Sequence, residues 1–303
     1  MATSSETVAK RPGFKDFYTL TKPNVVALMI VTSVIGMFMS VDGWVPWEPL
    51  ILGNLGIALC AGAAAAVNHV VDQQIDTRMA RTANRPIATG VVSTWQAVTF
   101  AAVIGGLGMA ILLLWVNAIT AWLTLASLVG YAFIYTMFLK RATPQNIVIG
   151  GLAGAAPPLL GWTAVTGEVH GHGLLLALII FAWTPPHFWA LAIHRKEEYA
   201  LVDIPMLPVT HGDAFTRLHI LLYTIVMFII TILPFVTRLS GPIYLAGAVV
   251  LGVIFLYWAL AMMFHWREDA PIQTFKYSIL YLVLLFVVML VDHYLYPTAT
   301  LGG

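Results

Sequence analysis

Three oxygen-bearing side chains recur at intervals of four residues where an apolar stretch ends: Asn68, Asp72 and Asp76. On an α-helix, four residues advance the chain by about 400°, so the three side chains should lie within roughly 80° on one face. Two carboxylates and an amide oxygen on one stripe repel one another unless a cation lies among them. Hard oxygen ligands of this kind suit Mg²⁺, which binds a few carboxylates together with phosphate oxygens and water. The spacing therefore predicts a Mg²⁺ site at these three residues.

Arginines follow this stripe directly, at Arg78, Arg81 and Arg85. The forked guanidinium group matches phosphate oxygens, and a diphosphate site requires acid for the metal beside base for the phosphates. The alternative is a solvated helix end whose charges pair with one another. Carboxylates beside a membrane-length apolar stretch are costly and usually functional, so we favour the metal–diphosphate interpretation.

A second mixture of acid and base follows a later apolar stretch and contains Arg195, Lys196, Tyr199 and Asp203. Prolines close behind it prevent a continuous helix, so the segment should form a turn or a lid. Taken alone, the run is more typical of a solvated surface. If the chain contains an internal duplication, this run occupies the position that corresponds to the first stripe. With that position taken into account, a functional site and a solvated surface are equally favoured.

Lys140 and Arg141 end another apolar stretch. They are either orientation signals of a membrane protein or a basic flank for the same diphosphate. The next segment, 150–158, is rich in glycine, alanine and proline. Small residues let membrane helices approach one another closely; the alternative is that they leave room for a flat, bulky ligand.

The composition identifies a membrane protein. Of 303 residues, 60% are hydrophobic and 10% are charged, whereas a soluble domain carries roughly 25% charged residues. The single cysteine, Cys60, excludes an internal disulfide and a CxxCH haem-attachment pair. A span needs about 20 mainly apolar residues. Nine stretches qualify, which predicts an all-α bundle: 24–41, 48–67, 93–116, 117–139, 145–165, 172–194, 215–238, 241–264 and 274–296.

The distribution of basic residues predicts the orientation. With a cytoplasmic N-terminus, every one of the 15 Lys and Arg residues except Arg238 falls in a cytoplasmic segment, as the positive-inside rule requires. The N-terminal residues contain no secretory signal, which favours the cytoplasmic membrane of a bacterium or archaeon. A net charge of +1 gives no reason to expect a nucleic-acid partner.

The chain is expected to form one membrane domain. Residues 1–23 would be a cytoplasmic segment, 24–296 the transmembrane domain and 297–303 a short tail. The two long cytoplasmic connections, about 68–92 and 195–214, are separated by four spans. This spacing suggests two four-helix units followed by a ninth helix, and repeat architectures commonly place the substrate site between the repeats.

These motifs resemble the UbiA superfamily of intramembrane prenyltransferases, whose first aspartate-rich motif is similar to residues 68–76. Further strings resemble its haem-modifying branch, the protohaem IX farnesyltransferases or haem O synthases: NRPI at 84–87, LKRATPQNIVIGG at 139–151, WTPPHFW at 183–189 and IPMLPV at 204–209. The resemblance extends from about Tyr18 to the last span. It departs from the superfamily at Leu207, where the second motif ends in aspartate. This leaves a second Mg²⁺ site near Asp203 in doubt.

The resemblance implies a bundle in which farnesyl diphosphate alkylates a vinyl group of haem B, giving haem O and diphosphate for a terminal oxidase. It implies Mg²⁺ held by Asn68, Asp72 and Asp76, with Arg78 also in the catalytic group. Membrane lipid surrounds the enzyme, and a haem A synthase or a terminal oxidase is the implied protein partner. The substrate-binding residues implied are Arg81, Arg85, Lys140, Arg141, Arg195, Lys196, Tyr199, Asp203 and His187.

Alternatives stay open at this point. His187 lies in an apolar span, so it is either a core histidine or a contact to haem. The enzyme could prenylate an aromatic quinone precursor, because the first motif would be the same. A transporter would also place polar groups between repeats, and a haem chaperone would bind haem without needing Mg²⁺.

Overall fold

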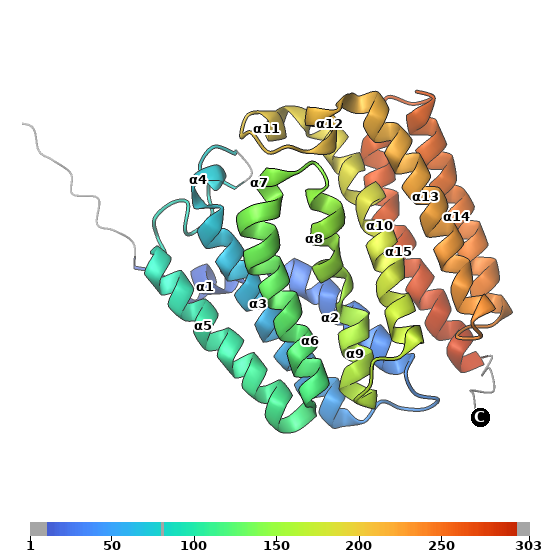
Figure 1. The fold of residues 1–303 in the computed structure, drawn as a ribbon, viewed down its shortest axis with the longest axis horizontal. Coiled ribbons are helices and arrows are strands. Elements are labelled where there is room, and N and C mark those ends of the chain that lie inside the picture. The colour runs from blue at the N-terminus through green and yellow to red at the C-terminus, as the bar shows by residue number, and fades with distance from the viewer. Residues whose placement is uncertain (1–10, 80–81, 296–303) are drawn as a thin grey trace, which may run out of the picture.

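The structure, a computed structural model, describes residues 11–79 and 82–295, and these ranges contain helices and no strand. The predicted tail, 297–303, lies outside them. Figure 1 shows the helices running side by side. The first half contains α1 (Phe14–Leu20), α2 (Pro23–Phe38), the π-helical η1 (Pro49–Gly53), α3 (Asn54–Val71), α4 (Gln73–Asp76), α5 (Thr94–Ile111), η2 (Leu112–Val116), α6 (Ala118–Val129), η3 (Gly130–Leu139) and α7 (Lys140–Ala142). The second contains α8 (Asn146–Ala155), α9 (Pro157–Thr166), α10 (Gly171–His194), α11 (Lys196–Ala200), α12 (Leu207–Thr210), α13 (Gly212–Val236), α14 (Pro242–Met263) and α15 (Ala270–Leu295).

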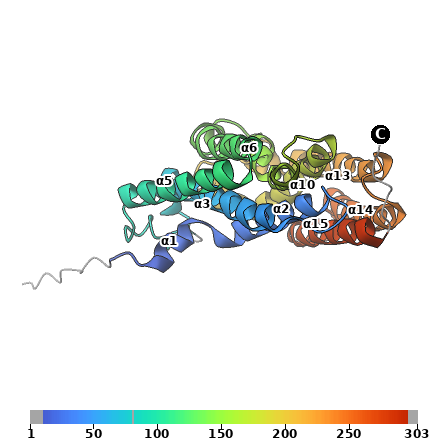
Figure 2. The same ribbon diagram turned by 90° about the horizontal axis from the view of Figure 1, so that it is seen from below.

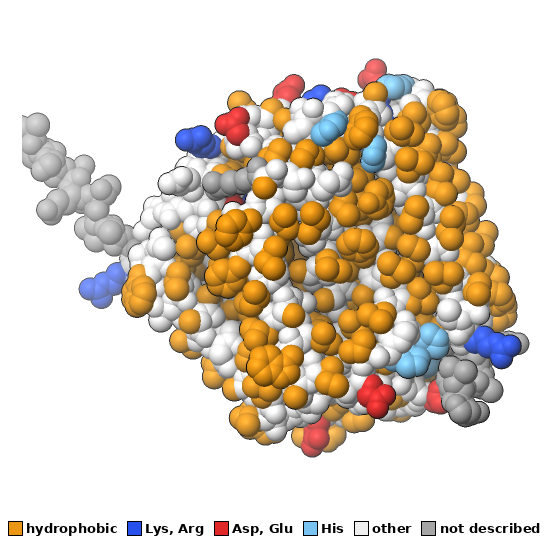
Figure 3. All heavy atoms as spheres, in the orientation of Figure 1, with side chains coloured by type: hydrophobic (Ala, Val, Ile, Leu, Met, Phe, Trp, Pro, Cys, Tyr) orange, Lys and Arg blue, Asp and Glu red, His pale blue; other side chains and the backbone are white. Residues whose placement is uncertain are grey.

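The helices have the lengths and composition of membrane spans. Within the described ranges, 8 helical stretches are long and apolar enough to cross a bilayer, and α1 with α2 forms a bent pair that makes up to 9. The nine predicted stretches each coincide with one of these units, which confirms an all-α polytopic membrane protein. Exposed apolar side chains cover the face in Figure 3, and the charged side chains lie at its margins. Figure 2 shows that the bundle is flattened.

The first span begins at a sharp bend. The axes of α1 and α2 differ by 55°, and Lys22 between them adopts a left-handed backbone with φ 50°. Proline disfavours helical backbone in the residue before it and is well suited to the first position of a new helix, so Pro23 both ends α1 and starts α2. The bend leaves α1 beside α5, where Phe17 and Phe100 lie 5.2 Å apart between ring centroids.

Two further breaks follow from local sequence. The third and fourth spans are separated at Asn117, whose extended backbone lies between η2 and α6 and whose side chain accepts a hydrogen bond from Thr120 N at 2.9 Å. The fifth span is interrupted at Ala156, because Pro157 cannot continue the hydrogen bonding of α8. It therefore consists of two helices, α8 and α9.

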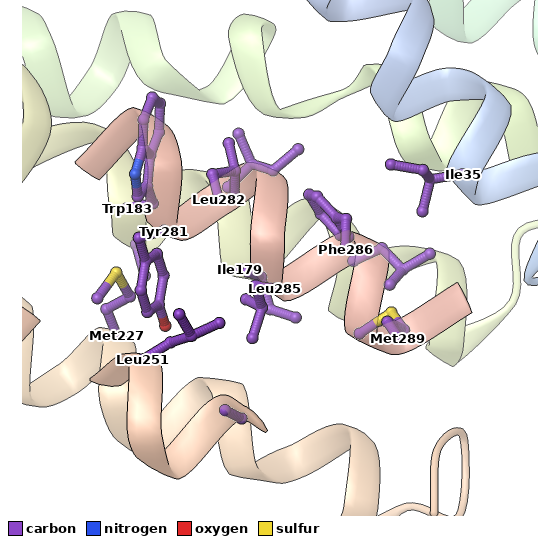
Figure 4. Packing of buried hydrophobic residues seen from close by; sticks show 14 of the residues in the cluster. Ile35, Ile179, Trp183, Met227, Leu251, Tyr281, Leu282, Leu285, Phe286 and Met289 are labelled. Atoms are coloured by element: carbon purple, nitrogen blue, oxygen red, sulfur yellow. The ribbon is translucent and has the colours of Figure 1, made fainter. Parts of the chain in front are cut away.

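The largest core joins α10 to α13, α14 and α15. Figure 4 shows Tyr281, Leu285 and Phe286 of α15 beside Ile179 and Trp183 of α10. Buried aromatic rings contribute much of the packing in such a core and need partners for their polar atoms. Trp183 Nε1 finds one by donating to the backbone oxygen of residue 278 at 2.8 Å. This core packs the helices of the second half of the bundle against one another.

Candidate active site

The predicted oxygen stripe is buried where α3 continues into α4. Asn68, Asp72 and Asp76 are each 3% exposed. Helical hydrogen bonding persists across the junction. The backbone N–H of Asp72 donates to the backbone oxygen of Asn68 at 3.0 Å, and the backbone N–H of Asp76 donates to the backbone oxygen of Asp72 at 2.9 Å. Asn68 Nδ2 also donates to Asp72 Oδ2 at 2.9 Å. The three side chains therefore form a continuous polar strip inside the protein rather than a solvated helix end.

Two lysines from distant segments contact this strip. Lys140, the first residue of α7, donates to Asp72 Oδ2 at 2.5 Å. Lys22, at the bend between α1 and α2, donates to Asn68 Oδ1. Thr136, one turn before Lys140, lies 3.5 Å from Asn68 Nδ2 and can accept a hydrogen bond from it. The first and fourth spans thus both supply groups to the end of the second.

The third member of the stripe has its own cation. Arg85 Nη1 lies 2.9 Å from Asp76 Oδ1 and 2.7 Å from Oδ2, and the carboxylate side chain is only 5% exposed. The intervening loop is held by Thr82, whose hydroxyl donates to the Asp76 backbone oxygen at 3.1 Å. Asn68, Asp72 and Asp76 therefore each contact a different cationic side chain, and the three cations come from three different segments.

The donor set fits a divalent cation that also binds phosphate. Asp72 Oδ1 is buried, and no hydrogen-bond partner for it occurs among the described residues. The same part of the chain contains no group of three or more His, Cys, Asp or Glu side chains that could hold a metal. An ion bound to Asp72 and Asp76 would need further oxygens from water or a ligand, and Mg²⁺ in phosphate sites is bound in that way.

Two further polar residues lie at this cluster, and the sequence assigned neither of them to the diphosphate site. Lys22 belongs to the string TLTKP before the first span, but nothing in its spacing indicated Asn68 as a partner. His69 is 2% exposed, and neither of its ring nitrogens has a hydrogen-bond partner within the described ranges. An unpaired polar group in a protein interior is costly, so His69 is a further candidate to face a ligand or water.

The other basic residues of the first motif are not brought into the cluster. Arg78 is exposed to the outside of the protein, because the chain turns after Asp76 and takes it off the helical face. Arg81 lies outside the described residues. Arg141 lies in α7, and its side chain is not among those described. Of the predicted phosphate-binding residues, the structure places Arg85 and Lys140 against the stripe.

One residue of the predicted second group, Arg195, Lys196, Tyr199 and Asp203, is buried. Tyr199 is 8% exposed and belongs to the same apolar cluster as Met79 and Ile147. The charged residues lie further out: Lys196 Nζ pairs with Asp213 at 2.9 Å, and Asp203 is exposed with φ 54°.

Arg195 lies 3.9 Å from Glu198, and both side chains are partly exposed. Only Tyr199 of the predicted second group is therefore enclosed. The others form a charged rim on the segment that follows α10.

His187 lies in the helical core, and its hydrogen-bond partner is on α15. Its Nδ1 is 2.6 Å from Ser278 Oγ, and its ring stacks on Trp183 with centroids 4.1 Å apart and on Phe275 at 4.7 Å. It is 7% exposed. The histidine is thus hydrogen-bonded and enclosed by aromatic rings, which matches the core interpretation considered for it.

A helical membrane bundle with buried carboxylates and paired cations at one end has the features of an intramembrane enzyme that acts on a lipid diphosphate. The chain belongs to the UbiA prenyltransferase family, which matches residues 29–299. Protoheme IX farnesyltransferase from Saccharophagus degradans is 68% identical over 94% of each chain. The enzyme of the same name from Stutzerimonas stutzeri is 63% identical over 97% of this chain and 99% of the relative.

Solved structures share the fold at low sequence identity. A digeranylgeranylglyceryl phosphate synthase superposes with a TM-score of 0.79 at 16% identity, covering 92% of this chain and 98% of that one. A UbiA homologue from Archaeoglobus fulgidus bound to GPP and Mg²⁺ has a TM-score of 0.63 at 15% identity, covering 90% and 99%. The protein is therefore a membrane prenyltransferase with the UbiA fold.

Proposed function

We propose that the protein transfers the farnesyl group of farnesyl diphosphate to a vinyl group of haem B and forms haem O. The observation that carries the donor half is the buried stripe, in which three oxygen-bearing side chains each contact a separate cation. The acceptor half rests on relatives of 63% to 68% identity that are named protoheme IX farnesyltransferase. These relatives favour haem over a quinone precursor as the acceptor.

The cations of the stripe would hold the diphosphate. Lys22, Lys140 and Arg85 lie beside oxygens that a metal ion would also use, so binding of a metal diphosphate would let these cations turn from carboxylate and amide oxygens to phosphate oxygens. Charge-assisted hydrogen bonds of this kind are about twice as strong as neutral ones. The stripe and its cations would thus exchange partners without a large movement of the backbone.

The residues suited to hold Mg²⁺ are Asp72 and Asp76, with Asn68 assisting, and the solved homologue bound to GPP and Mg²⁺ supports a requirement for this ion. When bound, the ion supplies positive charge that stabilises the leaving diphosphate. Lys22, Lys140 and Arg85 neutralise the same negative charge from the protein side. The exposed position of Asp203 gives no support for a second, symmetric ion.

The reaction needs no protein nucleophile. The C1–O bond of farnesyl diphosphate breaks, and its electron pair leaves with the diphosphate. The terminal vinyl carbon of haem B bonds to C1, which leaves a cation on the carbon next to the porphyrin. Water captures this cation and loses a proton, giving a hydroxyethylfarnesyl group. The chain's contribution is to bind the leaving group and to exclude water from the allylic cation until the carbon–carbon bond has formed.

The orientation follows from the basic residues. We place the stripe at the cytoplasmic face of a bacterial cytoplasmic membrane, with residues 24–296 as one prenyltransferase domain, because nearly all lysines and arginines then lie inside. The product is a membrane-embedded haem. The protein partner that would receive it is a haem A synthase or a terminal oxidase.

The direct test supplies purified protein with Mg²⁺, farnesyl diphosphate and either haem B or 4-hydroxybenzoate. We expect a prenylated haem and released diphosphate from the first mixture alone. Product from the benzoate but not from haem B would overturn the acceptor assignment and leave the prenyltransferase class intact. Haem binding without any turnover would instead favour a haem chaperone.

A further inference from the structure

A large apolar groove lies outside the stripe. Its volume is about 1170 Å³, and it is bounded by α6 and η3 on one side, α8 and α9 at its base, and α10 on the other side. These helices form the face seen in Figures 1 and 3. Small residues line the walls and the base, among them Ala126, Ala153 and Ala177. Substrate pockets for small molecules are typically about 300–1,000 Å³, so this groove can hold a molecule larger than a single prenyl chain.

One end of the groove adjoins the stripe through η3. Tyr135 lines the groove, while the next residue, Thr136, contacts Asn68 at 3.5 Å. Lys140, which directly follows η3, contacts Asp72 at 2.5 Å. A ligand lying in the groove with one edge at Tyr135 therefore has that edge next to the diphosphate site.

The opposite end carries two histidines with defined hydrogen-bonding roles. The backbone N–H of His172 donates to His170 Nδ1 at 3.3 Å, so the proton of a neutral His170 ring is on Nε2. His172 Nε2 lies 3.3 Å from the Thr237 backbone oxygen and donates to it, which leaves its Nδ1 with a lone pair. His170 thus offers a donor at this end, and His172 offers an acceptor or a metal ligand.

A smaller pocket of about 260 Å³ shares both histidines and extends this end of the groove. Arg238 lines it and supplies a cation; in the predicted topology it is the one basic residue on the outer side. Asp42 and Glu168 line it too, so recognition of an anion here would depend on directed hydrogen bonds rather than on net charge.

We propose that this groove binds the haem B acceptor, with its vinyl edge at Tyr135 and its propionate carboxylates at His170 and Arg238. The proposal rests on the proposed function for the identity of the ligand. The α10 residues that line the groove run from Gly171 to Phe181, which corresponds to about 15 Å along a helix and is comparable with a porphyrin measured from its vinyl edge to its carboxylates. Because vinyl and propionate groups lie on opposite edges of the porphyrin, a vinyl group near the stripe places the carboxylates at the histidine end.

The polar end favours haem over the farnesyl chain as occupant. His170 and Arg238 are exposed at the end of the groove, where they can bind the two carboxylates of a haem, whereas a hydrocarbon chain presents no anion to them. His172 Nδ1 is available to haem iron or to a bound water. The walls between the two ends are nearly all apolar, as a porphyrin ring requires.

The test compares tryptophan substitutions that fill the groove from one wall and from its base, Ala126→Trp and Ala153→Trp, with Ala102→Trp. Ala102 is an exposed α5 residue that lines neither pocket. Haem B is titrated into each full-length protein in lipid nanodiscs and followed by Soret absorbance, and KM is measured for both substrates. We expect both groove variants to weaken haem binding and raise the KM for haem about tenfold or more, with the KM for farnesyl diphosphate and the control variant unchanged.

Arg238→Gln tests the orientation. Wild-type protein should bind haem B more tightly than its dimethyl ester, and this preference should fall about tenfold in the variant. Groove variants that bind haem like wild type, or that raise only the KM for farnesyl diphosphate, would overturn the proposal. If wild-type protein makes no haem O, the proposed function fails, while the binding titration still decides whether the groove holds a porphyrin.

Discussion

Lys140 Nζ and Asp72 Oδ2 lie 2.5 Å apart and join the fourth span to the end of the second, while the other oxygen of Asp72 is buried without a hydrogen-bond partner in the described part of the chain. One oxygen of the Asp72 carboxylate therefore pairs with a lysine of the protein, and the other oxygen is free to bind a metal ion. This pair links the charge of the helical bundle to the place where a metal diphosphate would bind, and the predictions below test the groups around it.

Lys22 should be a binding residue for the donor. Lys22→Gln removes a charge-assisted hydrogen bond, worth about 1.5–3 kcal/mol, so we expect the KM for farnesyl diphosphate to rise about tenfold to a hundredfold. Lys22→Arg should recover part of the loss. Lys15→Gln, which removes an exposed lysine of α1, is the matched control, and an equal effect in both variants would argue against a specific role for Lys22.

Arg85 and Asp76 should be coupled in stability. Arg85→Gln leaves a buried carboxylate without its cation. We expect the free energy of unfolding to fall by about 1–3 kcal/mol, as measured by thermal unfolding of the detergent-solubilised protein. Adding Asp76→Asn should restore part of this loss, because the unpaired charge is then removed. Strictly additive effects in this double-mutant cycle would show that the two side chains do not interact.

Removal of divalent cations should abolish turnover without unfolding the protein. In EDTA, Lys140 and Arg85 can still satisfy Asp72 and Asp76, so we expect an unchanged melting temperature. Turnover should fall by about a thousandfold or more, which corresponds to about 4 kcal/mol at the barrier, and excess Mg²⁺ should restore it. Full activity in EDTA would contradict the assignment of the stripe to a metal.

The contact between α2 and α9 should depend on a glycine. A Cβ added to Gly161 would collide with the backbone oxygen of Ser33, so Gly161→Ala should destabilise the protein by about 1–3 kcal/mol or prevent its insertion as a folded bundle. At Gly154, by contrast, an added Cβ meets no atom within 4 Å in the described structure. Gly154→Ala should therefore leave the melting temperature unchanged, and equal losses in the two variants would contradict this account.

Much of the fold follows from local sequence. Apolar stretches of membrane length predicted the spans because a bilayer requires about 20 such residues, and the spacing of four placed Asn68, Asp72 and Asp76 on one side because the helix continues through them. Arg85 could also be predicted from local sequence, because it follows the stripe closely in the chain.

The cluster as a whole depends on tertiary packing that no local pattern contains. Lys22 is separated by 46 residues from Asn68, and Lys140 by 68 from Asp72. Arg78 was grouped with the phosphate-binding arginines, but it is exposed because the helix ends before it. His187 finds its partner Ser278 91 residues away, and its spacing within an apolar span could not distinguish this contact from one to haem.

The most direct measurement is the mass spectrum of haem extracted from a host that lacks this activity and expresses either the wild-type protein or Asp72→Asn. We predict a haem heavier than haem B by the mass of farnesol in the wild-type membranes, and only haem B in the variant at equal protein level. Equal amounts of the farnesylated haem from both would contradict the claim that the buried stripe performs the transfer.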